Sequence, residues 1–285
     1  MRDLLMGTLF MLIASGSSFS ESRNISISRS YEENINICIK GKNRKEVPGP
    51  EKTLHGLCES WKSRTCCDAS TTKYLHEVET WFQFDWGHCG QLSRTCMDFM
   101  LKDACFYECS PNLGPWRVYT IDGNPSKSNK NYPDERFMGV PICERDCRAW
   151  WHSCRHDLTC SGNWYVGPWN WTSKINQCIK ECRPMEEYFK TPKAFCENIW
   201  GGAYKMAPKG DDRCMRLHFT GENPNDEVCR YYAKALESKD EDARHVSHST
   251  ARVYGHTNAA LCTHCSLLWS CFAVFFMFMI GTEST

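Results

Sequence analysis

Two long apolar runs stand near the ends of the chain, and both have the pattern of segments that are removed during maturation. Residues 4–14 follow an early arginine and precede small residues, which predicts a secretory signal peptide over residues 1–20. This run is short for a membrane span, so a signal anchor is the weaker alternative. Residues 261–280 are mostly apolar, and no Lys or Arg follows them. Residues 261–285 therefore predict a GPI-attachment signal, with a retained membrane anchor as the alternative.

Two polar stretches divide what lies between these runs. Residues 237–260 hold charges, histidines and few apolar side chains, which predicts a disordered stalk rather than a metal site. Residues 120–136 contain the turn-forming pairs Asp-Gly and Asn-Pro, which predicts a long surface loop. Residues 21–236 are then expected to form one ligand-binding domain.

Inside this domain, two apolar patterns have different periods. The segment WFQFDW (81–86) alternates, so Phe82, Phe84 and Trp86 would share one face of an extended strand. If residues 99–109 are helical, Asp103 and Tyr107 share one face, and the two cysteines of this segment lie nearly opposite. The cysteine face would then be tied into the core, while the Asp/Tyr face looks elsewhere.

The chain has 20 cysteines among 285 residues, which is typical of a disulfide scaffold in a secreted protein. The pairs 105/109, 143/147 and 178/182 have i,i+4 spacing and 89/96 has i,i+7 spacing, so each pair would share a helix face. Zinc is the weaker reading, because this spacing is not the usual C-x₂-C clamp. The sixteen cysteines expected in disulfides are Cys38, Cys58, Cys66, Cys67, Cys89, Cys96, Cys105, Cys109, Cys143, Cys147, Cys154, Cys160, Cys178, Cys182, Cys196 and Cys214.

Removal of the C-terminal tail takes three cysteines with it and leaves an odd number. One thiol is then free or bonded to another molecule. We expect it to be Cys229, which lies in a helical run well past the other cysteines. Which of the remaining cysteines pair with one another does not follow from their spacing.

Charge and motifs exclude several classes of function. Lys plus Arg equals Asp plus Glu, so the formal net charge is zero, which disfavours a nucleic-acid binder. The chain has no G-x-S-x-G, H-E-x-x-H, P-loop or glycine-rich dinucleotide motif, so we do not expect an enzyme or a cofactor. His88 is expected to be structural. Asn24 and Asn170 begin N-x-[ST] sequons and are predicted glycosylation sites.

Aromatic side chains are unusually frequent, with 11 tryptophans. Some fill the small core that a disulfide-rich domain has. The sharper hypothesis is a pocket that stacks a flat ligand, with Asp103 as its polar anchor. A carboxylate accepts two parallel hydrogen bonds from a ring N–H and an adjacent amino group, and 2-aminopterins offer such an edge.

Several long motifs resemble one known family, the folate receptors. These are HCGQLSRTC, CFYECSPNLGPW, VPICERDCRAWW, NWTS and GENPNDEV, and the similarity spans roughly residues 37–236. Riboflavin-binding protein and the egg-surface sperm receptor Juno are relatives within this group. The resemblance implies an α+β fold, in which a small disulfide-stapled domain of helices and short strands surrounds a deep pocket.

The resemblance also implies a set of ligand-binding residues. The pterin-binding aspartate and stacking tyrosine of the family fall on Asp103 and Tyr107, and one pterin-contacting arginine falls on Arg136. The other positions that match, or that stand where the family has a pocket residue, are Phe82, Phe84, Trp86, Tyr132, Trp164, Tyr165, Gly167, Trp169, Trp171, Trp200, Ala203 and Tyr204.

The chain departs from the family pattern at several polar positions. Phe82 replaces a tyrosine, Ala203 replaces a serine, and Pro133 stands where the family has a second arginine. Tyr165 and Val166 replace a histidine and a lysine that face the glutamate tail of the ligand. Each lost hydrogen bond costs about 1 kcal/mol, so binding would be weaker than in the family.

Three functions therefore remain open. The leading hypothesis is a GPI-anchored receptor at the extracellular face of the plasma membrane, which binds folate or a reduced folate and takes it up by endocytosis. The second is a Juno-like adhesion receptor with a protein partner on another cell and no folate. The third is a binder of another flat vitamin such as riboflavin. Retention of Asp103 favours a ligand binder.

Overall fold

The computed structural model describes residues 30–41, 43–77, 80–81, 83–119 and 135–239. Several predicted features lie outside these residues, namely both terminal signals, most of the predicted loop and stalk, Asn24, Phe82 and Tyr132. Within the described part, none of the helices combines the length and the apolar character that crossing a membrane requires.

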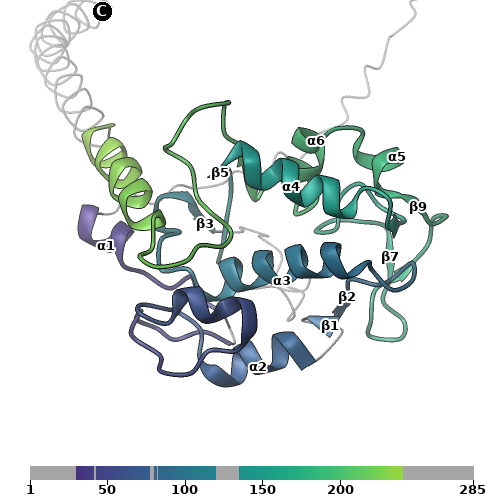
Figure 1. Ribbon diagram of the computed structural model, residues 1–285, viewed down its shortest axis with the longest axis horizontal. Coiled ribbons are helices and arrows are strands. Elements are labelled where there is room, and N and C mark those ends of the chain that lie inside the picture. The colour runs from purple at the N-terminus through teal and green to yellow at the C-terminus, as the bar shows by residue number, and fades with distance from the viewer. Residues whose placement is uncertain (1–29, 42, 78–79, 82, 120–134, 240–285) are drawn as a thin grey trace, which may run out of the picture.

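Short helices make up most of the regular structure, and the longest of them, α3, runs through the middle of the domain (Figure 1). Residues 225–239 are also helical. The bounds are α1 Tyr31–Ile35, η1 Gly56–Trp61, α2 Ala69–Glu77, α3 Arg94–Cys109, η2 Gly114–Trp116, α4 Glu144–Cys154, α5 Met185–Phe189 and α6 Pro192–Asn198, where η denotes a 3₁₀ helix.

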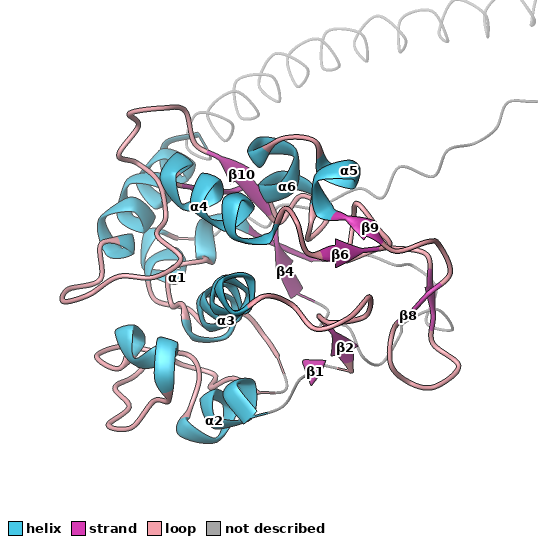
Figure 2. Ribbon diagram, turned by 45° about the vertical axis from the view of Figure 1, so that its right-hand side comes forward, coloured by secondary structure: helices cyan, strands magenta, loops and turns pink. Residues whose placement is uncertain are grey.

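Every sheet in the described part of the chain consists of two strands. Figure 2 shows β1 beside β2 and β6 beside β9. Four pairs are antiparallel, namely β1 (Thr80–Trp81) with β2 (Phe84–Asp85), β3 (Arg117–Tyr119) with β4 (Glu135–Phe137), β6 (Leu158–Thr159) with β9 (Arg183–Pro184), and β7 (Trp169–Asn170) with β8 (Gln177–Cys178). Strands β5 (Val140–Ile142) and β10 (Tyr204–Met206) are parallel. Helices with short paired strands confirm the predicted α+β class.

Helix α3 begins at a side-chain cap, because Ser93 accepts a hydrogen bond from the backbone N–H of Cys96. It ends at Cys109, and Pro111 follows two residues later. The prediction of a helix over 99–109 is thus confirmed, and the helix starts five residues earlier. The cysteines of α3 are buried, as are Met100 and Phe106, so most of this helix belongs to the core.

Eight disulfides staple the domain, and they use all sixteen predicted cysteines. Three of them fix α3 to its neighbours through Cys58–Cys105, Cys67–Cys109 and Cys96–Cys154. The others are Cys38–Cys66, Cys89–Cys182, Cys143–Cys214, Cys147–Cys196 and Cys160–Cys178. Cys229 is free and buried, so its side chain is not presented to another molecule.

Several predicted elements are wrong in detail. Cys178 lies in β8 and Cys182 just before β9, and Cys89 lies before α3, so these cysteines do not share helix faces. Trp81 pairs with Phe84 in the antiparallel strands β1 and β2, and Gln83 has a φ of 65°, so Trp81 and Trp86 do not belong to one extended strand. Residues 135–136 belong to β4, and residues 237–239 continue the last helix.

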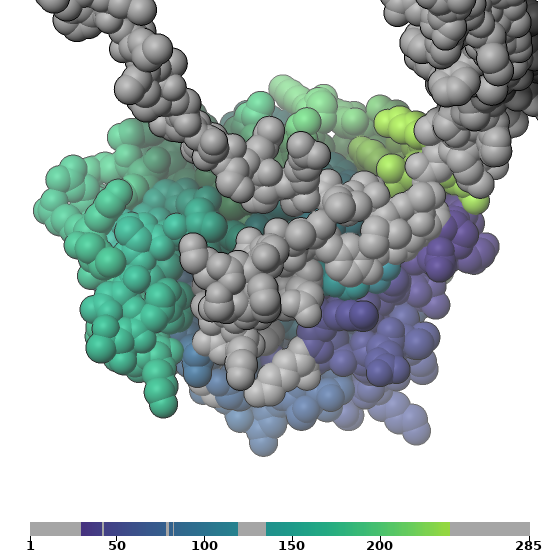
Figure 3. Space-filling view, turned by 180° about the vertical axis from the view of Figure 1, so that it is seen from behind, coloured from purple at the N-terminus to yellow at the C-terminus, as the bar shows by residue number. Residues whose placement is uncertain are grey.

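The described parts of the chain form two sides of one domain. In the space-filling view of Figure 3, the N-terminal segment up to α2 and the segment from α4 to β9 lie on opposite sides. Helix α3 packs against η1 and α2 on one side and against α4 on the other. One continuous apolar core connects the two sides. The residues of α3 that face away from the disulfides are therefore free to form a site.

Candidate functional site

A cavity of about 620 Å³ opens beside α3, a size typical of small-molecule sites. Eleven of the fifteen predicted ligand-binding residues line it, namely Phe84, Trp86, Asp103, Tyr107, Arg136, Trp164, Tyr165, Trp171, Trp200, Ala203 and Tyr204. They come from segments spread over the whole domain, so the fold brings together residues that are far apart in the sequence. Phe82 and Tyr132 lie outside the described residues.

The carboxylate of Asp103 lies deep in this cavity, with a side chain that is 4% exposed. Its Oδ2 accepts a hydrogen bond of 2.7 Å from the indole N–H of Trp200, and its Oδ1 accepts one from the hydroxyl of Tyr204. Burial raises the pKa of Asp103 to about 7, although both hydrogen bonds favour the charged form. The cavity thus holds an acid that changes its charge near neutral pH.

Aromatic rings form two groups in the walls of the cavity that contains Asp103. One wall contains Phe84, whose ring centroid lies 5.7 Å from the centroids of both Trp164 and Trp200. The other wall contains Phe137, which lies 5.6 Å from Tyr107 and 5.5 Å from Tyr204. A flat ligand between these walls could stack on apolar faces while its polar edge meets the carboxylate.

The position of Tyr107 depends on a buried ion pair behind it. Nε of Arg44 lies 2.9 Å from Oε2 of Glu108, and both side chains are almost completely buried. The guanidinium carbon of Arg44 lies 4.0 Å from the ring centroid of Tyr107. Burial is the largest single effect on the pKa of Arg44 and lowers it, but the combined interactions with Glu108 and Tyr107 raise this pKa above its ordinary value. Arg44 therefore supports the ring from outside the cavity.

Arg136 lies on strand β4 and contacts the backbone next to Trp200. Its Nη2 donates hydrogen bonds of 3.1 Å to the carbonyl oxygens of Trp200 and Gly201. Its guanidinium carbon also lies 3.8 Å from the ring centroid of Tyr165. These contacts fix a guanidinium in the cavity wall before any ligand is present.

Gly167 and Trp169 are predicted ligand-binding residues that do not line the cavity. The indole N–H of Trp169 donates to the carbonyl oxygen of Trp164 at 3.0 Å, so Trp169 supports the wall from behind. A Cβ at Gly167 would lie 2.7 Å from Asn163 O and from Trp169 Nε1, which leaves room only for glycine. Both residues therefore shape the tryptophan-rich segment 163–171, called the tryptophan loop below.

His88 also supports this loop, through contacts of both of its ring nitrogens. Its Nδ1 lies 2.9 Å from Asp85 O, its Nε2 lies 3.0 Å from Thr159 Oγ1, and that hydroxyl accepts a hydrogen bond from Trp164. Burial lowers the pKa of His88, which favours the neutral ring.

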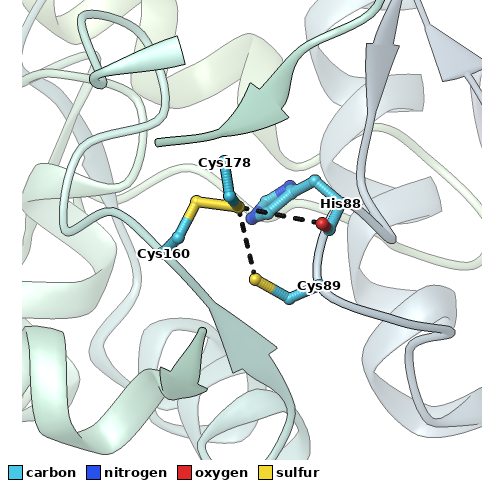
Figure 4. A group of neighbouring side chains, drawn as sticks. All are labelled: His88, Cys89, Cys160 and Cys178. Atoms are coloured by element: carbon cyan, nitrogen blue, oxygen red, sulfur yellow. Dashed lines mark hydrogen bonds between the residues drawn. A yellow bond between two sulfur atoms is a disulfide. The ribbon is translucent and has the colours of Figure 1, made fainter. Parts of the chain in front are cut away.

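Figure 4 shows His88 beside the sulfur atoms of Cys89, Cys160 and Cys178. Sγ of Cys89 lies 3.4 Å from Sγ of Cys178, so two disulfides pack against each other here. Because all three cysteines are engaged in disulfides, they offer no thiolate to a metal ion. The cluster is best understood as the staple that holds the tryptophan loop.

Five lining residues were missed by the sequence analysis, namely Trp81, Gln83, Ala104, Phe137 and Lys174. Ala104 follows Asp103 on α3 and Phe137 follows Arg136 on β4, but adjacent residues of a helix or strand point in different directions, so adjacency alone did not predict that they line the same cavity. Lys174 stands in a polar turn with no pattern that marks it. Its φ of 66° becomes visible only in the structure.

Comparisons with known proteins agree with the site. A sequence model described as the folate receptor family matches residues 37–216. The chain belongs to the folate receptor family. Human folate receptor gamma is 37% identical over 241 residues, covering 82% of this chain and 94% of that protein. Human folate receptor alpha is 40% identical over 211 residues, covering 72% and 79%.

A more distant relative of this chain is named for another vitamin, riboflavin. Riboflavin-binding protein of Dromaius novaehollandiae is 31% identical over 183 residues, covering 63% of this chain and 70% of that protein. The relatives named here are binding proteins or receptors.

Proposed function

We propose that this chain is a cell-surface receptor that binds folate or a reduced folate in the cavity beside α3 and takes it up by endocytosis. The observation that carries the proposal is the buried carboxylate of Asp103 in a cavity that is lined mostly by aromatic side chains. A 2-aminopterin offers a flat ring for the walls and two adjacent N–H donors for a carboxylate. The names of the folate receptors among the relatives point to the same ligand.

Each lining group has a role in this proposal. Tyr107 and Trp200 contact the faces of the pterin, and Asp103 accepts hydrogen bonds from its ring N–H and amino group. Arg136 donates a hydrogen bond to the pterin carbonyl. Because Trp200 and Tyr204 already donate to Asp103 in the ligand-free site, the ligand must replace or share these hydrogen bonds. This exchange lowers the net gain from each new bond.

The predicted signals at the two ends would place this site outside the cell. A signal peptide would direct the chain into the secretory pathway, and a GPI anchor would hold the domain at the extracellular face of the plasma membrane. The disulfides support an oxidising compartment. Asn170 is exposed in β7 and is accessible to glycosylation.

A titration with folic acid tests the proposal. The protein is expressed in a secreted form, and quenching of its tryptophan fluorescence is followed at pH 7.4. We expect saturable quenching, and Asp103→Asn should weaken binding by about 100-fold or more, since each hydrogen bond to a charged group contributes about 1.5–3 kcal/mol. Asp98→Asn is the matched control, because Asp98 is exposed on the same helix and does not line the cavity.

The same titration separates the two other functions. Absence of quenching by folic acid and by reduced folates would overturn the proposal and direct the search to a protein partner on another cell. Saturable binding of riboflavin in place of folic acid would assign the cavity to that vitamin. We expect folate to bind weakly. Ala203 lines the cavity and offers no side-chain hydrogen bond. Val166 is 69% exposed and carries no charge.

A further inference from the structure

Lys174 is the exposed cation of the cavity, and we propose that it binds the carboxylate end of the ligand. This inference rests on the proposed function, because it takes a folate as the ligand. It assigns a specificity-determining role to a residue that the sequence pattern does not mark. The ligand would then lie with its pterin edge on Asp103 and its anionic end at Lys174.

The position of Lys174 is fixed by the hairpin that carries it. It lies in the turn between β7 and β8, and its backbone N–H donates a hydrogen bond of 2.9 Å to Trp171 O. Two residues later, Asn176 is buried, and its side-chain amide bonds both the backbone N–H and the carbonyl oxygen of Asp85. This contact docks the turn on β2, whose Phe84 lines the same cavity. The lysine is therefore held at the cavity rather than on a detached loop.

The cavity has an acidic group that is buried and a basic group that is exposed to solvent. Asp103 is buried, whereas Lys174 lines the cavity and is exposed to solvent. Among the described residues, Lys174 forms no ion pair. Arg136, the other cationic residue of the described lining, donates to two carbonyl oxygens, contacts the ring of Tyr165 and is assigned to the pterin carbonyl in the proposed function. Lys174 is thus the lining cation that remains available to an anionic group.

The charge pattern selects a particular kind of ligand. The deep end favours hydrogen-bond donors, since a carboxylate only accepts them. The open end favours an anion, because a lysine ammonium is a compact point charge on a flexible stem. Folic acid carries a donor edge on its pterin and carboxylates at its far end, so its polarity matches that of the cavity.

The backbone at Lys174 makes a clean experiment possible. Its φ of 66° lies in the left-handed region, which glycine adopts without a steric cost. Lys174→Gly therefore removes the ammonium without straining the turn. Lys190 is the matched control, because it also has a left-handed φ of 64°, is exposed, and does not line the cavity. Lys190→Gly reproduces the backbone change without touching the site.

The test compares folic acid with its dimethyl ester, which has the same rings but no charge at the far end. Binding of both compounds to the wild-type protein, Lys174→Gly, Lys174→Glu and Lys190→Gly is measured by fluorescence titration at low and at physiological salt. We expect Lys174→Gly to weaken binding of folic acid by about two- to fivefold at low salt, as for an exposed charge pair, and to leave binding of the ester unchanged. Lys174→Glu should weaken folic acid further, and Lys190→Gly should behave like wild type.

The outcomes separate this inference from the proposed function. If wild type binds folic acid but Lys174→Gly keeps the wild-type ratio between folic acid and ester, the inference is wrong and the proposed function stands. If both compounds weaken equally in Lys174→Gly, the lysine acts through the shape of the turn, and the inference is also wrong. If wild type binds neither compound, the proposed function fails and takes this inference with it.

Discussion

The indole N–H of Trp200 donates a hydrogen bond of 2.7 Å to Oδ2 of Asp103, so the carboxylate at the bottom of the cavity has a partner before a ligand arrives. Trp200 follows α6 and Asp103 lies in α3, so this contact connects the end of α6 to α3. The hydroxyl of Tyr204 donates to the other oxygen of Asp103. The two hydrogen bonds orient the carboxylate and offset part of the free-energy cost of burying it.

Ligand affinity should fall steeply between pH 7.4 and pH 5. The pKa of Asp103 is raised to about 7 by burial, so the residue is mostly ionised at pH 7.4 and almost fully protonated at pH 5. If the ligand binds the ionised form alone, affinity drops up to about tenfold for each pH unit below 7. Burial also raises the pKa values of the lining residues Tyr107 and Tyr204, so neither hydroxyl ionises in this range. Fluorescence titrations at five pH values check this, and a flat profile would contradict it.

Tyr204→Phe should move the midpoint of that pH profile to higher pH. The hydroxyl of Tyr204 donates to Asp103 and favours the ionised form, so its removal raises the pKa of Asp103 further. A hydrogen bond to a charged group is worth about 1.5–3 kcal/mol, which corresponds to about one to two pH units. The matched control is Phe137→Leu, which changes the same wall and removes no hydrogen bond. An unchanged midpoint in Tyr204→Phe would show that another group controls the profile.

Asp103→Asn should make the ligand-free protein more stable at pH 7.4. Because the folded-state pKa of Asp103 lies above its unfolded value, its favourable contribution is complete below the unfolded pKa and is lost as the pH rises through about 7. A neutral amide avoids this loss, and we expect a gain of about 1–3 kcal/mol in the free energy of unfolding. Urea unfolding with intact disulfides at pH 7.4 and pH 5 measures it. An equal gain at both pH values would contradict the titration argument.

Arg44→Met should destabilise the domain by about 3–5 kcal/mol, because it leaves the Glu108 carboxylate buried without its partner. The double variant Arg44→Met with Glu108→Gln should recover part of this loss, since it removes the unpaired charge. Folic acid binding should also weaken in the double variant, because Tyr107 loses the guanidinium behind its ring. A double variant no more stable than the single one would show that packing, not charge, dominates.

The thiol of Cys229 should resist alkylation in the folded protein. It is buried, and burial raises its pKa to about 12, so the reactive thiolate is scarce. Iodoacetamide should label it only after unfolding, and non-reducing gels should show a monomer. Rapid labelling of the native protein would contradict its buried position.

The sequence predicted the parts of the site that depend on local periodicity. The placement of Asp103 and Tyr107 on one face of a helix, away from Cys105 and Cys109, follows from helix geometry alone. The same rule misled for Cys178 and Cys182, because i,i+4 spacing also fits a strand and the turn that follows it. Spacing along the chain does not distinguish these structures.

Contacts between distant segments were beyond prediction from residue patterns. The contacts of Arg44 with Tyr107 and Glu108 join residues that are more than sixty positions apart in the sequence. The hydrogen bond from Asn176 to Asp85 does the same. Disulfide partners such as Cys89 and Cys182 are separated by 93 residues. Such pairs are selected by the packing of the whole core, and the local sequence carries no signal for them. The wall residues of the pocket were found largely through the family resemblance.

The contact between Asp103 and the pterin edge is tested most directly by a thermodynamic cycle that combines one change in the ligand with one substitution in the protein. Folic acid and an analogue with methyl in place of the 2-amino group are titrated into wild type and Asp103→Asn at pH 7.4. The account predicts that loss of the amino group weakens binding to wild type by about 2 kcal/mol or more and barely affects Asp103→Asn, so that the two changes are coupled. Equal effects of the analogue on both proteins would contradict the contact between Asp103 and the pterin edge.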